Sequence, residues 1–536
     1  MSTPTAMVRH NFGNITTTVD VLVIGGGITG AAIAYESASR GLSVALVEKS
    51  DFGGATSAAT GKLIHGGLRY LKQFNIRLVR ESLAERRTLM SIAPNLVDPI
   101  GMVLPEPGLV ERVGLSVYDL LSADRNRIPD ASKHIPRHRV LDHDELVRRG
   151  LPELNSGALF HDAVMAFPER LTLAFLRSAQ THGALLANGV AVETIIGATG
   201  QVVGAHVRDE LTNSQGEIRA AITVNATGPW VRDVLAASPL TRALAGPEPA
   251  VRSEGIYLVT RELSPTMVLT VSGHSHFSFA PWRGLSLIGP TETAYHGAVA
   301  DWRLTRASIE DFIAAINVSS KLPVTLDIGD VLAAYGGLRP LTDQAGEDTY
   351  NASRASELVD HRADGLAGIV SASGGKYTTS RAFAQKVVDS LVRAHDLPAR
   401  PSATAKTLLT GCAPIAESPV RAGTLSTTST DIIATMYGPD AGAVADLAAQ
   451  RPELARAVTD DGVPLAAVVY SARHESPRNL TDLLLRRTGI GTVGLPADAD
   501  LAAMAQLAGA ELGWDTDRVN AERVAAKAAI SLPGSP

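Results

Sequence analysis

Cysteine is almost missing from this chain of 536 residues, in which Cys412 stands alone. A single cysteine excludes an intrachain disulfide and favours a cytosolic, reducing setting. Aromatic residues are scarce at 4%, whereas hydrophobic residues as a whole reach 45% and charged residues 19%. That balance is typical of a globular protein and excludes a chain that is mostly disordered. The length predicts about three to four domain-sized units.

An excess of positive charge is also lacking. Lys and Arg number 49 against 55 Asp and Glu, so the formal net charge is −6 and nucleic acid is not expected as a partner. The most apolar stretch, residues 21–35, contains four glycines and is shorter than the ~20 residues that a membrane span needs. Asp20 precedes it, where a signal peptide would carry positive charge. The sequence therefore predicts neither a span nor a signal peptide.

Residue patterning predicts several kinds of structure along the chain. Residues 1–18 are polar and rich in Thr, so we expect a flexible tail. From Val19 a strand, a glycine turn, a helix and a second strand follow, which predicts a βαβ unit and a parallel sheet. Short apolar runs between residues 250 and 335 indicate antiparallel strands. Helices are expected at residues 76–90, 171–182 and 378–392, and an Ala- and Leu-rich helical segment follows a linker at 397–403.

Gly25, Gly27 and Gly30 form a G-x-G-x-x-G motif between the first strand and the first helix. In that order, the glycines permit a tight turn, close approach of the backbone to a pyrophosphate, and close packing of the helix. The helix N-terminus then offers N–H groups to the diphosphate. Glu48 ends the second strand, where a carboxylate can bind ribose hydroxyls. The pattern predicts a dinucleotide site rather than a chance glycine-rich turn.

The motif does not distinguish NAD from FAD, but three later segments favour a flavin. Ala226-Thr227-Gly228 follows an apolar strand, and Arg339 stands beside the flexible pair Gly336-Gly337. Gly374-Gly375-Lys376 precedes a helix, where N–H groups and an ammonium can stabilise negative charge on a reduced flavin. Each segment alone could be an ordinary turn. Together they indicate one long ligand that is contacted from distant parts of the chain.

The segment GKLIHGGLRYL at residues 61–71 resembles the signature of the FAD-dependent, quinone-linked glycerol-3-phosphate dehydrogenases. The likeness runs from about residue 19 to 530 and includes NATGPWV (225–231), GGLRPL (336–341), GGKYTTSR (374–381) and RHESPRNLTDLLLRRTGIG (473–491). The resemblance implies an α/β FAD-binding fold, Rossmann-like and of the D-amino-acid/glycine oxidase type. It also implies an antiparallel β substrate subdomain and an all-α C-terminal domain.

These implied parts give a domain plan. The tail of 1–18 precedes an FAD-dependent oxidoreductase domain at 19–396, and the C-terminal helical domain covers 404–530. The FAD-binding parts are expected at about 19–105, 155–235 and 335–396, and the substrate sheet at about 240–335.

The resemblance further implies oxidation of sn-glycerol 3-phosphate to dihydroxyacetone phosphate, with hydride transfer to flavin N5 and electrons passed to a membrane quinone. It implies that FAD is bound by Gly25, Gly27, Gly30, Glu48, Thr56, Ser57, Lys62, Gly66, Gly67, Ala226, Thr227, Gly228, Gly375, Lys376 and Tyr377. No metal site is predicted.

A phosphorylated alcohol needs cationic groups, and Arg can bind it through two hydrogen bonds. Arg69, Arg339 and Lys376 are the predicted cations, and Tyr70 can donate a hydroxyl. Arg339, Lys376 and His65 are the candidate catalytic residues, with His65 a proton acceptor. The alternative for a single Arg is a structural ion pair, and for His65 a structural histidine.

Two departures from the family pattern affect the substrate. Gly255 stands where a substrate-side histidine is expected, which removes a polar group and is expected to open space at a substrate-binding position. Residues 166–171 read Ala-Phe-Pro-Glu-Arg-Leu, where an acidic pair is usual. Another polyol phosphate, such as erythritol phosphate, is therefore an alternative substrate.

Residues 109–139 join an apolar stripe to a basic end. One interpretation is a peripheral contact with the cytoplasmic face of a membrane, near the quinone; the other is a helix packed in the core with a solvated basic loop. A homodimer is an alternative for the oligomeric state, which the sequence does not determine. The remaining alternatives in function are an oxidase that uses oxygen, a flavin-binding sensor without turnover and an NAD-dependent dehydrogenase.

Overall fold

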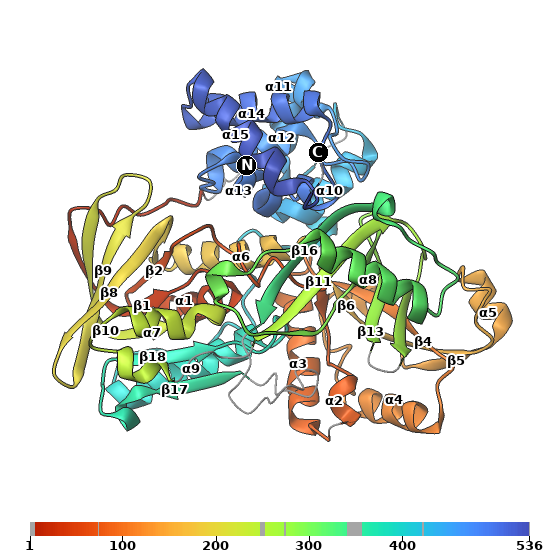
Figure 1. Cartoon of the computed structure of the whole chain (residues 1–536), viewed down its shortest axis with the longest axis horizontal. Coiled ribbons are helices and arrows are strands. Elements are labelled where there is room, and N and C mark those ends of the chain that lie inside the picture. Colours follow the sequence, from red (N-terminus) through yellow and green to blue (C-terminus); the bar gives the residue numbers. More distant parts are fainter. Residues whose placement is uncertain are drawn as a thin grey trace.

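Two β-sheets and a separate group of helices make up the protein (Figure 1). The computed structural model describes residues 6–72, 74–246, 252–272, 275–339, 356–420 and 423–534. In Figure 1 the C-terminal helices, drawn in blue, lie above the two sheets.

The first sheet has eight strands, and its central strands are parallel. Its order is β17-β18-β10-β1-β2-β7, and the β8–β9 hairpin joins β10. The strands are β1 (Thr16–Ile24), β2 (Val44–Glu48), β7 (Leu185–Asn188), β8 (Val190–Ala198), β9 (Gln201–Asp209), β10 (Gln215–Asn225), β17 (Glu357–Asp360) and β18 (Ile369–Ser373). This arrangement confirms the predicted βαβ unit and its parallel sheet.

Both faces of this sheet are covered. Val21 and Val23 of β1 pack in one core with α1 (Ile28–Ser39), α6 (Pro168–Thr181) and α9 (Ser380–His395). Leu22 and Ile24 pack in a second core on the other face, together with Leu235 of α7 (Val231–Ala237). Burial on both faces explains why β1 reads as a continuous apolar run rather than an alternating one.

The second sheet has ten strands and extends beyond the predicted range of 240–335. Its order is β15-β11-β14-β13-β12-β4-β6-β3, with β16 beside β11 and β5 beside β6. The strands are β3 (Leu63–Ile64), β4 (Asp98–Pro105), β5 (Arg139–Leu141), β6 (Gly157–Val164), β11 (Arg252–Arg261), β12 (Met267–Ser272), β13 (Ser275–Trp282), β14 (Leu285–Gly289), β15 (Thr293–Tyr295) and β16 (Val331–Arg339).

Strands β3 to β6 thus come from segments that the sequence analysis did not assign to this sheet. They pair with it through long-range contacts, such as Met267 with Met102, that local patterning does not reveal. Helix α8 (Arg306–Ser319) covers one face, where Ile309 and Phe312 pack with Phe277. On the other face lie α2 (Arg69–Lys72), α3 (Ile76–Ile92) and α4 (Leu109–Leu121), and α5 (His143–Arg148) follows β5.

The C-terminal domain is helical and has its own core, as predicted. Its helices are α10 (Thr427–Tyr437), α11 (Ala441–Gln450), α12 (Leu465–His474), α13 (Leu480–Asp482), α14 (Asp498–Leu512) and α15 (Thr516–Ile530), and a π-helical turn occupies Leu483–Arg487.

The N-terminal segment differs from the predicted flexible tail. Met7 donates its N–H to the carbonyl of His474 over 2.8 Å, and Phe12 is only 1% exposed. Arg9 forms an ion pair of 2.6 Å with the buried Asp209, and β1 already begins at Thr16. Met7 and Phe12 are isolated apolar residues that anchor this segment to the rest of the protein. Because they form no periodic pattern, the sequence does not predict this anchoring.

Candidate active site

A single cavity of about 2000 Å³ runs from the carboxyl ends of β1 and β2 to the second sheet. The edge formed by the carboxyl ends of parallel strands is where open α/β sheets bind ligands. Gly25, Gly27 and Glu48 line the cavity where it meets the first sheet, and Arg339, the last residue of β16, lines it from the second sheet. Two ends of different character therefore share one cavity.

Steric contacts explain the glycines of the first turn. Gly25 has φ +105°, and a Cβ there would lie 2.7 Å from the carbonyl oxygen of Ala226. A Cβ on Gly30 would lie 1.9 Å from the carbonyl oxygen of Gly25, so only glycine lets α1 pack this closely. Gly27 is less confined, since the nearest atom to an added Cβ is Ser57 Oγ at 3.1 Å.

The loop that follows β2, residues 49–57, lies against this turn. Glu48 accepts hydrogen bonds from the N–H groups of Gly26 (2.8 Å) and Ser50 (2.7 Å). Desolvation by burial raises the pKa of Glu48, and these two hydrogen bonds oppose that rise. Ser57 Oγ accepts from the N–H of Ile28 over 2.9 Å, at the first residue of α1.

The glycine segments predicted to share one ligand do meet at this cavity. Strand β10 lies beside β1 and β18 lies beside β10 in the same sheet, so residues 226–228 and 374–376 follow neighbouring strand ends. Gly336 and Gly337 reach the cavity from the second sheet. The hydroxyl of Thr56 donates to the carbonyl of Leu338 over 2.6 Å, which joins the loop after β2 to β16.

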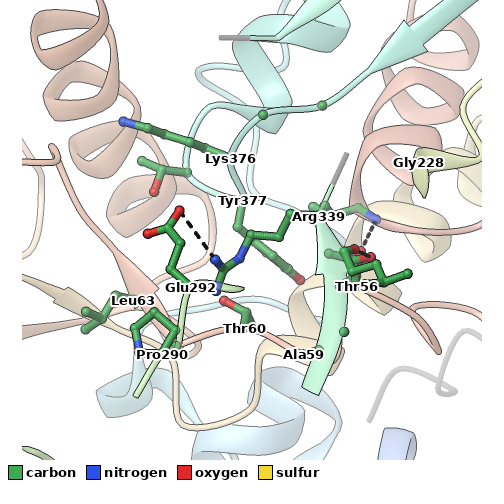
Figure 2. A pocket seen from close by; sticks show the side chains of 18 of the residues that line it. Thr56, Ala59, Thr60, Leu63, Gly228, Pro290, Glu292, Arg339, Lys376 and Tyr377 are labelled. Atoms are coloured by element: carbon green, nitrogen blue, oxygen red, sulfur yellow. Dashed lines mark hydrogen bonds and ion pairs between the residues drawn. The ribbon is translucent and has the colours of Figure 1, made fainter. Parts of the chain in front are cut away.

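Arg339 occupies the other end of the cavity, at the last residue of β16. Its Nη1 lies 3.9 Å from Glu292 Oε1, the ion pair drawn in Figure 2, and donates to Ser253 Oγ over 3.5 Å. The side chains of Arg339 and Glu292 are 18% and 12% exposed. Glu292 was not singled out in the sequence, because no motif marks it.

The expectation that Gly255 opens space is wrong. A Cβ on Gly255 would lie 2.0 Å from Arg339 Nη2, so the guanidinium covers this glycine. Gly255 does not line the cavity, and the volume that a side chain would take is filled by Arg339. Pairing of Ser253 with Arg339 across β11 and β16 makes Gly255 a diagonal neighbour, two residues along the strand.

Lys376 lies apart from Arg339 and extends away from it in Figure 2. Its ammonium is 3.8 Å from the centroid of the Tyr70 ring and donates to Ser82 Oγ over 3.2 Å. Tyr70 and His65 also line the cavity, and the His65 N–H donates to Thr378 Oγ1 over 3.1 Å. Arg69 begins α2, but its side chain, like all of residues 340–341, lies outside the described part.

Lys62, predicted to contact the cofactor, does not line the cavity. Its backbone has φ +60° and its ammonium lies 3.2 Å from Glu169 Oε1 and 4.6 Å from the centroid of the Tyr335 ring. Burial lowers the pKa of Lys62, against the opposing charge of Glu169. Glu169 comes from the segment that lacks the usual acidic pair, so a carboxylate is still present there.

Asp162 is a site residue that the sequence analysis missed, since it belongs to no recognisable motif. This buried carboxylate accepts from the Gly66 N–H (3.2 Å), Arg86 Nη1 (2.5 Å) and the Tyr118 hydroxyl (2.7 Å). Burial raises the pKa of Asp162, while the charge of Arg86 and these hydrogen bonds oppose the rise. Gly66 itself does not line the cavity, but its neighbours His65 and Gly67 do. By accepting from the Gly66 N–H, Asp162 holds the backbone that carries these two residues.

Three further residues predicted to bind FAD, Gly67, Gly228 and Tyr377, line the cavity. Tyr377 lines the cavity, and its hydroxyl donates to the carbonyl of Pro168 over 2.6 Å and lies 2.7 Å from Thr172 Oγ1. Gly67 and Gly228 line the cavity with positive φ values of +78° and +58°. The described parts of the chain contain no group of three or more His, Cys, Asp or Glu that could hold a metal ion.

Comparison with known proteins shows to which family this chain belongs. Residues 20–389 match the family model "FAD dependent oxidoreductase", and residues 402–519 match "C-terminal domain of alpha-glycerophosphate oxidase". The glycerol-3-phosphate dehydrogenase of Synechocystis is 32% identical, with 95% of this chain and 96% of that protein covered. The chain belongs to the FAD-dependent glycerol-3-phosphate dehydrogenase family.

Two solved structures share the fold of this chain. The glycerol-3-phosphate dehydrogenase of Bacillus halodurans, complexed with FAD, superposes with a TM-score of 0.72 at 24% identity and covers 97% of this chain and 96% of its own. Glycine oxidase of Geobacillus kaustophilus has a TM-score of 0.51 at 22% identity, covering 70% of this chain and 95% of its own. The predicted fold class is confirmed, and FAD is the cofactor of this dehydrogenase family member.

Proposed function

We propose that the protein oxidises sn-glycerol 3-phosphate to dihydroxyacetone phosphate in this cavity, with FAD as the hydride acceptor. The observation that carries the proposal is the continuity of one cavity that is lined both by the glycine turn and by the cations Arg339 and Lys376. A flavin-binding sensor without turnover has no need of Arg339 and Lys376, whereas these cations suit a substrate that carries a phosphate dianion.

The residues around the cavity suit an extended dinucleotide. Gly25 and Gly27 present backbone rather than side chain at the start of α1, where a pyrophosphate is favoured, and Glu48 ends β2. Thr56, Ser57, Gly67, residues 226–228 and residues 375–377 would hold the rest of the cofactor. When bound, the flavin supplies the hydride-accepting atom.

The substrate groups divide between two sides of the chamber. Arg339, held by Glu292 and Ser253, would bind the phosphate or the reacting oxygen; Lys376, with Tyr70 and His65, would bind the other part of the substrate. His65 is the candidate proton acceptor. Because Arg339 fills the place beside Gly255, the change at Gly255 does not by itself open room in the cavity for erythritol phosphate, and glycerol 3-phosphate is the preferred assignment.

A quinone is the proposed electron acceptor, reached at a membrane surface. Leu71, Phe74 and Val113 line the cavity, and Phe74 and Val113 are 87% and 55% exposed. Helix α4 buries Leu115 but leaves Leu109 and Leu120 exposed, which favours the surface interpretation of this segment. Among the helices that the structure describes, none is long and apolar enough to cross a bilayer.

The test is steady-state turnover of the purified holoenzyme with glycerol 3-phosphate, without NAD. A ubiquinone analogue and an artificial dye should each support turnover, whereas oxygen alone should not. Hydrogen peroxide formed at the same rate with oxygen alone would assign an oxidase instead. Turnover with erythritol phosphate but not with glycerol 3-phosphate would assign another polyol phosphate.

A further inference from the structure

The C-terminal helical domain contributes no residue to the walls of the cavity in the described part of the chain, since every lining residue lies between Ile24 and Thr378. Two arginines of this domain nevertheless reach the loop at residues 49–57, which we call the cofactor loop. Arg486 and Arg487 both form ion pairs with Asp51 of that loop.

The Asp51 carboxylate accepts four hydrogen bonds. Its Oδ2 accepts from Arg486 Nε (2.6 Å) and Arg487 Nη1 (2.8 Å). Its Oδ1 accepts from Arg487 Nη2 and from the side-chain amide of Asn188, each over 2.8 Å. The grip of Arg487 is therefore bidentate, the arrangement in which arginine binds a carboxylate most firmly.

This cluster lies in the interior. Asp51 is 2% exposed and Arg487 is fully buried. Burial alone would raise the pKa of Asp51, but the charges of Arg487 and Arg486 lower it, so the carboxylate stays ionised. Removing one partner of such a buried pair leaves an uncompensated charge, which is costly.

The backbone of the C-terminal domain is shaped for this contact. Residues 483–487 form a π-helical turn, an irregularity often found at functional sites. Consecutive residues of a regular α-helix do not share a face, yet both arginines reach one carboxylate here. Arg487 is held further, because its Nε donates to the carbonyl of Glu475 over 2.8 Å and its carbonyl accepts from Arg170 Nη1 over 3.0 Å.

The cofactor loop, which Arg486 and Arg487 hold through Asp51, also contacts the glycine turn. The Gly53 N–H donates to the carbonyl of Gly26 over 3.0 Å, and a Cβ on Gly26 would lie 2.7 Å from the ring of Phe52. At the far end of the loop, Ser57 accepts from Ile28, the first residue of α1. The loop thus packs directly on the glycine turn, whose residues Gly25 and Gly27 line the cavity.

We propose that the C-terminal domain clamps the cofactor loop, and that Arg486 and Arg487 are positioning residues for FAD. Through Asp51 they hold the loop against the glycine turn, so the helical domain sets the affinity for the cofactor without touching it. The proposal rests on FAD as the cofactor and is independent of the identity of the substrate.

The test uses the full-length chain with Arg487→Met, which removes the bidentate donor but keeps an apolar stem. Apoprotein of the variant and of wild type is titrated with FAD. We expect the Kd for FAD to rise about tenfold or more, since that factor needs only part of the cost of breaking a buried pair. Tryptic cleavage after the exposed Lys49, which lies in the loop, should become faster. Should Arg487→Met fail to fold, Arg486→Met carries the same test.

Asp461→Asn is the matched control. It breaks the ion pair of 2.5 Å between Asp461 and Arg283, which ties the same domain to the second sheet instead of to the cofactor loop. The control should lower the melting temperature but leave the Kd for FAD and cleavage after Lys49 at wild-type values. An arginine variant that folds and keeps the wild-type Kd would overturn the proposal, as would an equal loss of FAD affinity in Asp461→Asn.

Discussion

The two ends of the cavity are built in different ways. At the glycine end, backbone meets backbone: an added Cβ on Gly30 would lie 1.9 Å from a carbonyl oxygen, which cannot rotate away. At the cationic end, an added Cβ on Gly255 would lie 2.0 Å from Nη2 of Arg339, the tip of a flexible side chain. Position 30 at the first end therefore tolerates only glycine, whereas the second end can adjust. Substitutions at the two ends should have different consequences.

Gly30→Ala should have the largest effect. Overpacking of backbone against backbone typically costs ~1–3 kcal/mol of unfolding free energy, and here it would also distort the turn that faces the pyrophosphate. We expect loss of tightly bound FAD, measured as flavin per mole of folded protein, and a lower melting temperature. Gly27→Ala, which meets only the Ser57 hydroxyl at 3.1 Å, serves as the milder control. Full flavin content in Gly30→Ala would show that the turn is not confined.

Arg339→Lys should leave FAD content and melting temperature unchanged but impair catalysis. Lysine keeps the charge and loses the planar fork that binds a phosphate through two hydrogen bonds. A charge-assisted hydrogen bond is worth ~1.5–3 kcal/mol, so kcat/KM for glycerol 3-phosphate should fall by roughly 10- to 150-fold. Near-wild-type kcat/KM would make Arg339 structural.

Gly255→Ala should act through Arg339, because the new methyl group would displace the guanidinium. We expect a fall in kcat/KM of about tenfold or less, with unchanged flavin content. The same substitution made in Arg339→Lys should add little, since coupled residues are not additive. Fully additive effects in the double variant would contradict the steric link between the two residues.

These differences explain what the sequence could and could not reveal. Gly25, Gly27, Gly30 and Glu48 were identifiable because the turn, the helix start and the strand end are local features with fixed spacing. The relation between Gly255 and Arg339 was not, because it depends on the register of β11 with β16. Pairing between strands that are far apart in the sequence also brought β4 and β6 into the second sheet. Asp162 lies in β6 and belongs to no sequence motif, so it could not be predicted.

Glu292→Gln should have the smallest effect. The Glu292 carboxylate lies 3.9 Å from Arg339 Nη1 in a partly solvated pair. Such pairs contribute ~0.2–1 kcal/mol, so KM for glycerol 3-phosphate should change by about 1.5- to 5-fold while kcat stays near wild type. A loss as large as that of Arg339→Lys would instead place the carboxylate in direct contact with the reacting atoms.

Anaerobic mixing of the holoenzyme with glycerol 3-phosphate tests the central claim most directly, because it needs no electron acceptor and follows the flavin itself. The account predicts that the absorption of the oxidised flavin bleaches and that dihydroxyacetone phosphate forms in equal amount to the flavin reduced. A flavin that stays oxidised at saturating glycerol 3-phosphate, in protein with full FAD content, would contradict the proposed function.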